Sequence, residues 1–68
     1  HIIHPDDREM VEQSISEQLK NNRFYSLRYR ILRKDTTPLW IYERGSAVIN
    51  EYGEQFILSF LFALYEQE

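Results

Sequence analysis

The chain has no cysteine among its 68 residues, which excludes disulfides, thiolate metal sites and cysteine nucleophiles. It has only two glycines and two prolines, and it contains no glycine-rich phosphate loop, low-complexity tract or internal linker. The longest apolar run, at residues 56–65, spans about ten residues and is too short for a membrane-spanning helix. These gaps leave a small module that binds rather than catalyses.

The chain also has little net charge. Eleven acidic residues against eight basic ones give a net charge of -3, so neither nucleic acid nor an anionic membrane is expected as a partner. Four arginines lie between Arg23 and Arg33, and we interpret them as a solvated strand face. A chain of this length forms one domain at most, and its small core leaves stability marginal. Without disulfides or a metal, association with a partner subunit is the expected support.

The N-terminal end shows no basic and then apolar leader, and the first residue is His1 rather than methionine. We therefore expect a processed chain or a piece of a longer protein, in the cytoplasm.

Residues 5–21 are predicted to form a helix, because apolar residues recur there every three to four positions. These residues are Met10, Val11, Ile15 and Leu19. Pro5 suits the first helical position, and the two aspartates after it place negative charge at the positive end of the helix dipole. The apolar stripe is narrow, so the helix can cover only part of one sheet face.

Three strands are predicted to follow, over about residues 24–34, 39–50 and 55–65. The first alternates apolar and polar residues with a period of two. Residues 35–38 and 51–54 carry turn formers. The third strand includes FILSFLFALY, residues 56–65, which is strongly apolar at eight of ten positions and needs cover on both faces. The expected fold is α+β, with one N-terminal helix followed by a three-stranded antiparallel meander.

The strand pairing follows by counting if both loops have four residues. The predicted pairs are Arg30 with Glu43, Ile31 with Tyr42, Tyr42 with Ala63, and Ile49 with Phe56. This register predicts a cross-strand ion pair between Arg30 and Glu43. One sheet face would collect Tyr25, Leu27, Tyr29, Ile31, Trp40, Tyr42, Val48, Ile57 and Leu61. The other would collect Ile41, Ala47, Ile49, Phe56, Leu58, Phe60, Phe62 and Leu64, with Arg28, Arg30 and Glu43.

Four short motifs in this order resemble the C-terminal half of a PAS domain, including its PAC motif. They are HPDDR at residues 4–8, YRILRKD at 29–35, LWI at 39–41 and YGE at 52–54. The resemblance covers nearly the whole chain. It implies a partial form of an α/β sensor module with a five-stranded antiparallel sheet, in which the final strand lies beside the first. The chain departs from the family at Thr36, where the family usually has glycine after aspartate, and at residues 63–65, where ALY stands in place of Asp-Ile-Thr.

The resemblance also implies that the final strand is an edge here, because the two N-terminal strands of the family have no counterpart in the chain. An unpaired apolar edge is a template for another chain. We therefore predict a homodimer or higher oligomer, with the apolar face of the last strand buried between subunits. The predicted interface residues are Phe56, Leu58, Phe60, Phe62 and Leu64.

The sequence also contains candidate residues for a metal site and for a ligand site. His1, His4, Asp6 and Asp7 could form a metal cluster, but helix capping explains them better, and no metal is predicted. Neither a haem-binding histidine nor a flavin-reactive cysteine has a counterpart, so no cofactor is predicted. The candidate ligand-facing residues are Tyr29, Trp40, Tyr42 and Leu61, which are more typical of a core than of a pocket.

The leading hypothesis is a PAS-type sensory and signalling module that acts by homodimerisation and once preceded an output domain. The alternative is a small-molecule-binding sensor domain with a pocket between the helix and the Tyr/Trp sheet face. An enzyme fragment ranks last, because no nucleophile and base pair is visible, so no catalytic residue is predicted.

Overall fold

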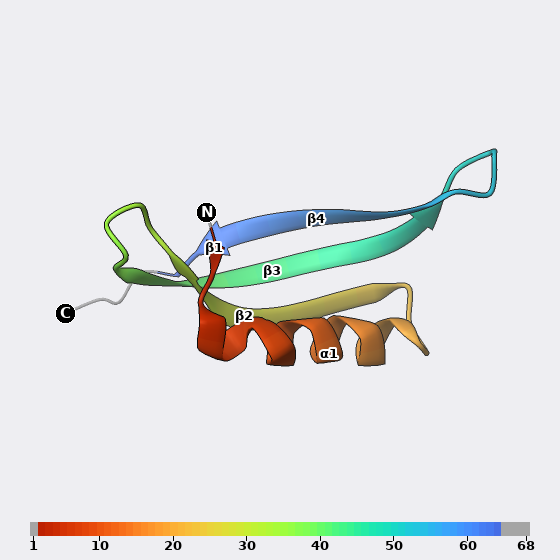
Figure 1. Ribbon diagram of the computed structural model, residues 1–68. Helices are drawn as coiled ribbons and strands as arrows, with labels where there is room; N and C mark the ends of the chain where they lie inside the picture. Colours follow the sequence, from red (N-terminus) through yellow and green to blue (C-terminus); the bar gives the residue numbers. More distant parts are fainter. Residues whose placement is uncertain (1, 65–68) are drawn as a thin grey trace.

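The computed structural model describes residues 2–64. Its elements are β1 (Ile2–Ile3), the 3₁₀ helix η1 (Pro5–Asp7), α1 (Arg8–Leu19), β2 (Phe24–Leu32), β3 (Pro38–Ile49) and β4 (Gln55–Ala63). The four strands form one antiparallel sheet in the order β1-β2-β3-β4. Helix α1 runs along β2, and β4 lies at the far side of the sheet (Figure 1). The predicted α+β class is confirmed.

The bounds of the elements differ from the prediction in several places. The predicted helix 5–21 begins as η1 and continues as α1 only from Arg8 to Leu19. The first predicted strand ends at Leu32 rather than at residue 34. Strand β1 was not predicted, because two residues are too short to show a period. The predicted last strand extended to Tyr65, which lies outside the described residues.

Both hairpins are closed by loops of three residues rather than four. Arg33 N–H donates to Thr37 O over 3.0 Å, and Asn50 N–H donates to Glu54 O over 2.9 Å. The last loop residue has a positive φ in each case, 67° at Thr36 and 80° at Gly53. A left-handed third residue is typical of three-residue hairpin loops, and this shared geometry sets the register of the whole sheet.

The predicted register was wrong in both hairpins. The observed pairs are Arg30 with Trp40, Ile31 with Leu39, Ile41 with Ala63, Tyr42 with Phe62, Val48 with Phe56, and Ile49 with Gln55. The first hairpin is shifted by three residues and the second by one, because the loops are shorter and the first starts earlier than assumed. An odd shift exchanges the faces of one strand relative to its partner.

The sheet therefore has two faces that differ from the predicted ones. The helix side carries the odd-numbered residues of β2, β3 and β4, and the open side carries their even-numbered residues. Trp40, Tyr42 and Val48 were predicted on the same face as Tyr25, but they lie on the open side. Ile41 and Glu43 were predicted on the other face, but they lie on the helix side.

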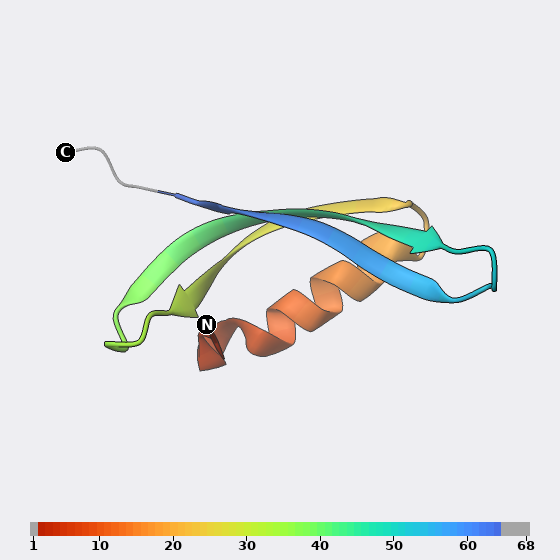
Figure 2. The same ribbon diagram turned by 90° about the horizontal axis from the view of Figure 1, so that it is seen from above.

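The core lies between α1 and the helix side of β2 and β3. Its buried residues are Val11, Tyr25, Leu27, Tyr29, Ile31 and Ile41. Ile15 and Leu19 of α1 pack against this cluster, whereas Met10 is 42% exposed and lies outside it. The sheet is arched, and α1 occupies its concave side below β2 (Figure 2). One short helix thus covers one half of one face, and β4 lies beyond its reach.

Candidate functional site

Strand β4 has all nine of its residues exposed, although most of them are large and apolar. On the open side the exposed fractions are 46% for Phe56, 59% for Leu58, 72% for Phe60 and 51% for Phe62. On the helix side Ile57 is 50% exposed and Leu61 is 44% exposed. Contiguous apolar surface of this kind marks an interaction site in a soluble protein. The strand is uncovered on both faces.

Four of the five predicted interface residues share one face. Phe56, Leu58, Phe60 and Phe62 project from the open side of β4. Leu64 follows the strand, and its N–H donates to Trp40 O over 2.9 Å.

Aromatic residues of β3 extend the same surface. The rings of Tyr42 and Phe62 lie 6.3 Å apart between centroids, which is within the range of favourable aromatic pairs. Phe62 is thereby continuous with the β3 face, and the apolar surface spans both strands.

A hollow of about 750 Å³ runs across the open side from β4 to β2. Its lining residues on this face are Phe24, Ser26, Tyr42, Arg44, Ser46, Leu58, Phe60 and Phe62. Gln18 of α1 also lines it. So do Tyr25, Gly45 and Ser59, which are paired with one another across β2, β3 and β4. The hollow is broad and open, and it forms a depression on the predicted interface face.

The four candidate ligand-facing residues do not form one wall. Tyr29 and Leu61 lie on the helix side, whereas Trp40 and Tyr42 lie on the open side. The Arg30 guanidinium lies over the Trp40 ring, with its central carbon 5.5 Å from the ring centroid, and Trp40 remains 46% exposed. This is a cation–π distance, and it gives Arg30 and Trp40 a role in holding adjacent strands.

Glu43 is the least expected residue on the helix side. It is 7% exposed, and its two carboxylate oxygens accept hydrogen bonds from the hydroxyls of Tyr25 and Tyr29. The predicted Arg30–Glu43 ion pair was wrong, because the two side chains lie on opposite faces. A buried carboxylate with two hydroxyl donors is a satisfied polar group within an otherwise apolar core.

The pKa values of the two tyrosines follow from this arrangement. Burial, and then the hydrogen bond to Glu43, raises the pKa of Tyr25 to about 12. The same causes raise the pKa of Tyr29. Both hydroxyls therefore stay protonated donors at neutral pH. Gly45 makes room for this cluster, because a Cβ there would overlap the Tyr25 ring.

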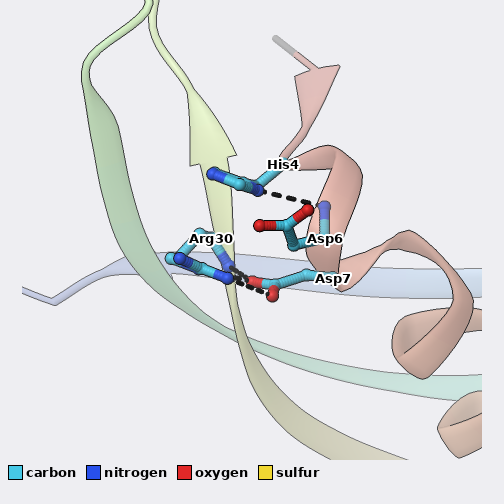
Figure 3. A network of polar contacts seen from close by, with 4 residues as sticks. All are labelled: His4, Asp6, Asp7 and Arg30. Carbon is cyan, nitrogen blue, oxygen red and sulfur yellow. Dashed lines mark hydrogen bonds and ion pairs between the residues drawn. The ribbon is translucent and has the colours of Figure 1, made fainter.

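Asp7 joins the start of α1 to β2. Its carboxylate accepts from the Arg30 backbone N–H at 2.8 Å, from Nε at 2.9 Å and from a terminal guanidinium nitrogen at 2.6 Å (Figure 3). His4 Nδ1 accepts from the Asp6 N–H at 3.1 Å and caps η1. The helix start is thus attached to the sheet by side chains of the HPDDR motif.

The Arg30 side chain is also the main reason that the pKa of Asp7 falls from 3.8 to about 2. A depressed carboxyl pKa contributes stability that is present above pH 4 and is lost as the pH falls towards 2. The Arg30 side chain is 29% exposed, so solvent screening reduces the contribution to about 1–2 kcal/mol.

Two of the four candidate metal ligands make other contacts in the structure. His4 caps η1, Asp7 is bound to Arg30, and His1 lies outside the described residues. Within residues 2–64, no three histidine, aspartate or glutamate side chains gather as a metal site would require. None of the helices in that range combines the length and hydrophobicity needed to cross a membrane.

Sequence reasoning missed the partners of Glu43 and of Asp7. A signal for the first was present, because Glu43 interrupts the inward series Leu39, Ile41, Glu43 of β3 and therefore points into the core. No local signal connects Asp7 with Arg30, which is 23 residues away. That contact depends on the pairing of β1 with the end of β2, which brings η1 beside that strand.

Comparisons with known proteins agree with this architecture. Residues 1–60 match the family model of the PAS fold. Among solved structures, the chain is similar to a sensory box histidine kinase/response regulator from Burkholderia thailandensis E264, with 29% identity and a TM-score of 0.74. That match covers 94% of this chain and 50% of the other, so this chain spans half the length of the solved chain. None of the curated proteins compared with the chain matches it. Since the family model spans most of the sequence, the chain belongs to the PAS fold family.

Proposed function

We propose that this chain is a sensory signalling module that acts by self-association through β4. Membership of the PAS fold family supports a sensory role, as does the similarity to a chain described as a sensory box histidine kinase/response regulator. The proposal includes a longer cytoplasmic parent protein with a separate output domain, and it assigns no catalytic step to this chain.

The observation that carries the proposal is the exposure of every residue of β4. Burying the remaining surface of a half-exposed phenylalanine or leucine contributes about 1 kcal/mol. Four such residues on the open side, in each of two copies, supply enough to offset the entropy of association. The broad hollow on the same face provides a surface into which side chains of a partner can pack.

Sedimentation velocity over a range of protein concentrations tests this proposal. We expect a dimer that dissociates on dilution, together with a melting temperature that rises with concentration. The Phe60→Lys variant should raise the dissociation constant more than about tenfold, because it places an unpaired charge in the interface. Tyr52→Lys is the matched control, since Tyr52 is 78% exposed but lies in the β3–β4 turn. A wild-type chain that remains monomeric at high concentration contradicts the proposal.

A small-molecule sensor is the second candidate, favoured by one observation. The hollow of about 750 Å³ on the open side is lined by Tyr42, one of the candidate ligand-facing residues, and by the polar side chains of Gln18 and Arg44. A ligand that copurifies, or a melting shift that depends on added ligand and not on protein concentration, would support this candidate.

A further inference from the structure

The hollow on the open side lies where short side chains stand among large ones. Two cross-strand rows bound it, Phe24–Ser46–Leu58 and Ser26–Arg44–Phe60. The two serines are the short members of these rows, and the hydroxymethyl group of a serine reaches less far from the sheet than a phenyl ring. The resulting volume of about 750 Å³ lies within the range of about 300–1,000 Å³ that is usual for small-molecule sites.

This hollow belongs to a face of the sheet and not to its edge. The residues that line it on the open side come from all three long strands, β2, β3 and β4. A further strand paired with the outer edge of β4 would lie in the plane of the sheet and would leave this face open. The hollow therefore does not depend on whether β4 is an edge strand or a central one.

Among the described residues that line the hollow, Arg44 alone carries a charge. Its side chain is exposed, and neither of the two ion pairs within residues 2–64 involves it. The even-numbered residues of β2, β3 and β4, which form this face, include no aspartate or glutamate. A guanidinium without a carboxylate on its own face of these strands is suited to an anionic partner, and arginine binds carboxylates with two parallel hydrogen bonds.

The rest of the lining is mainly aromatic. Phe24 is 70% exposed and Phe60 is 72% exposed, so both rings are accessible to a flat ligand. The hydroxyls of Tyr42 and Ser46 lie at the same hollow and can donate to an acceptor oxygen. An apolar surface with a few polar groups is typical of small-molecule sites, in which the polar groups fix the orientation of the ligand.

We propose that the open-side hollow binds a small aromatic carboxylate, whose rings pack among the phenylalanines and whose carboxylate pairs with the Arg44 guanidinium. The proposal rests on the small-molecule candidate of the proposed function, to which it gives a ligand class and a binding residue. It also connects that candidate with self-association, because Leu58 and Phe60 belong both to the hollow and to the proposed interface. A ligand in the hollow and a second copy on the same face therefore exclude each other.

Isothermal titration calorimetry with 2-naphthoate tests the site directly. The matched probe is 2-naphthamide, which has the same rings and a neutral amide in place of the carboxylate. For a ligand of this size in an open site we expect a dissociation constant of about 0.1–1 mM. The amide should bind at least about tenfold more weakly, because it forms no ion pair with Arg44. Equal affinities for the two probes would indicate an apolar surface suited to a protein partner, and would overturn the proposal.

Two variants separate the charge from the shape of the hollow. Arg44→Gln should bind naphthoate about tenfold more weakly and leave naphthamide binding unchanged. Arg28→Gln is the matched control, because Arg28 lies on the same side of β2 but does not line the hollow. Ser46→Leu should weaken both probes more than about tenfold, since the larger side chain fills the space between Phe24 and Leu58. Circular dichroism checks the fold of each variant.

Either of two results with these variants would overturn the site. One is equal binding of naphthoate by Arg44→Gln and Arg28→Gln, which would show that the charge at the hollow has no part in binding. The other is wild-type binding of both probes by Ser46→Leu, which would show that the probes bind elsewhere on the chain.

Sedimentation velocity with and without naphthoate distinguishes this inference from self-association. At about three times its own dissociation constant, naphthoate should raise the dissociation constant of the dimer more than about tenfold, because both copies must release their ligand. A dimer that binds naphthoate and is not weakened overturns the shared surface. A chain that dimerises but binds neither probe overturns the site and leaves self-association standing. A chain that stays monomeric contradicts self-association, and the two probes still decide whether the site exists.

Discussion

Replacing Asp7 with alanine is expected to be the most damaging single change at the junction of helix and sheet. The substitution removes the acceptor of three hydrogen bonds from Arg30, at 2.6, 2.8 and 2.9 Å. Each bond to a charged group contributes about 1.5–3 kcal/mol. The Arg30 side chain is 29% exposed, however, so water can hydrate its charge and the sum is smaller than three full bonds. We expect a loss of about 2–3 kcal/mol in the free energy of unfolding.

That loss is large for a domain of this size. A chain of this length has a free energy of unfolding of about 3–10 kcal/mol. The melting temperature of a domain of 60–100 residues falls by about 4–8 °C for each kcal/mol lost, so Asp7→Ala should melt about 10–20 °C lower. Urea unfolding followed by circular dichroism, at one fixed protein concentration, measures the difference.

Two comparisons make the test specific. Asp6→Ala is the matched control, because the neighbouring carboxylate accepts no hydrogen bond within residues 2–64 and its loss should cost less than about 0.5 kcal/mol. The wild-type chain should lose stability between pH 4 and pH 2, as Asp7 with its pKa of about 2 takes up a proton, and Asp7→Ala should lack this component. A loss below about 0.5 kcal/mol for Asp7→Ala, or the same acid component in both proteins, would refute the reasoning.

Three further predictions concern the sheet. Glu43→Gln should lower the Tyr25 pKa from about 12 part of the way towards 10, since burial remains when the negative charge is gone. Absorbance titration near 295 nm measures this pKa, and an unchanged titration would argue against the Tyr25–Glu43 contact. Gly45→Ala should cost about 1–3 kcal/mol in thermal unfolding, because its Cβ meets the Tyr25 ring, and a neutral result would show that the ring is free to move. Thr36→Gly should raise the free energy of unfolding by up to about 1 kcal/mol by relieving the positive φ of a β-branched residue, and a destabilised variant would contradict this.

The local elements of this protein were readable from its sequence. The helical spacing of Val11, Ile15 and Leu19 and the period of two in β2 depend on each residue and its near neighbours, so the α+β class and the order of the main elements could be predicted. The strongly apolar β4 was also visible in the sequence as a strand that needs cover. The four short motifs were sufficient to indicate the PAS fold.

The tertiary structure alone decided which side chains meet. The left-handed residues Thr36 and Gly53 allow loops of three residues rather than the predicted four. The resulting register places Trp40 and Tyr42 on the open side of the sheet and Glu43 in the core. Successive side chains of a strand point to opposite faces, so an error of one residue in the predicted length of a loop assigns every side chain of the next strand to the wrong face. The Asp7–Arg30 pair likewise depends on the pairing of β1 with the end of β2. Periodicity describes one element at a time, whereas register and long-range pairs arise only when elements pack together.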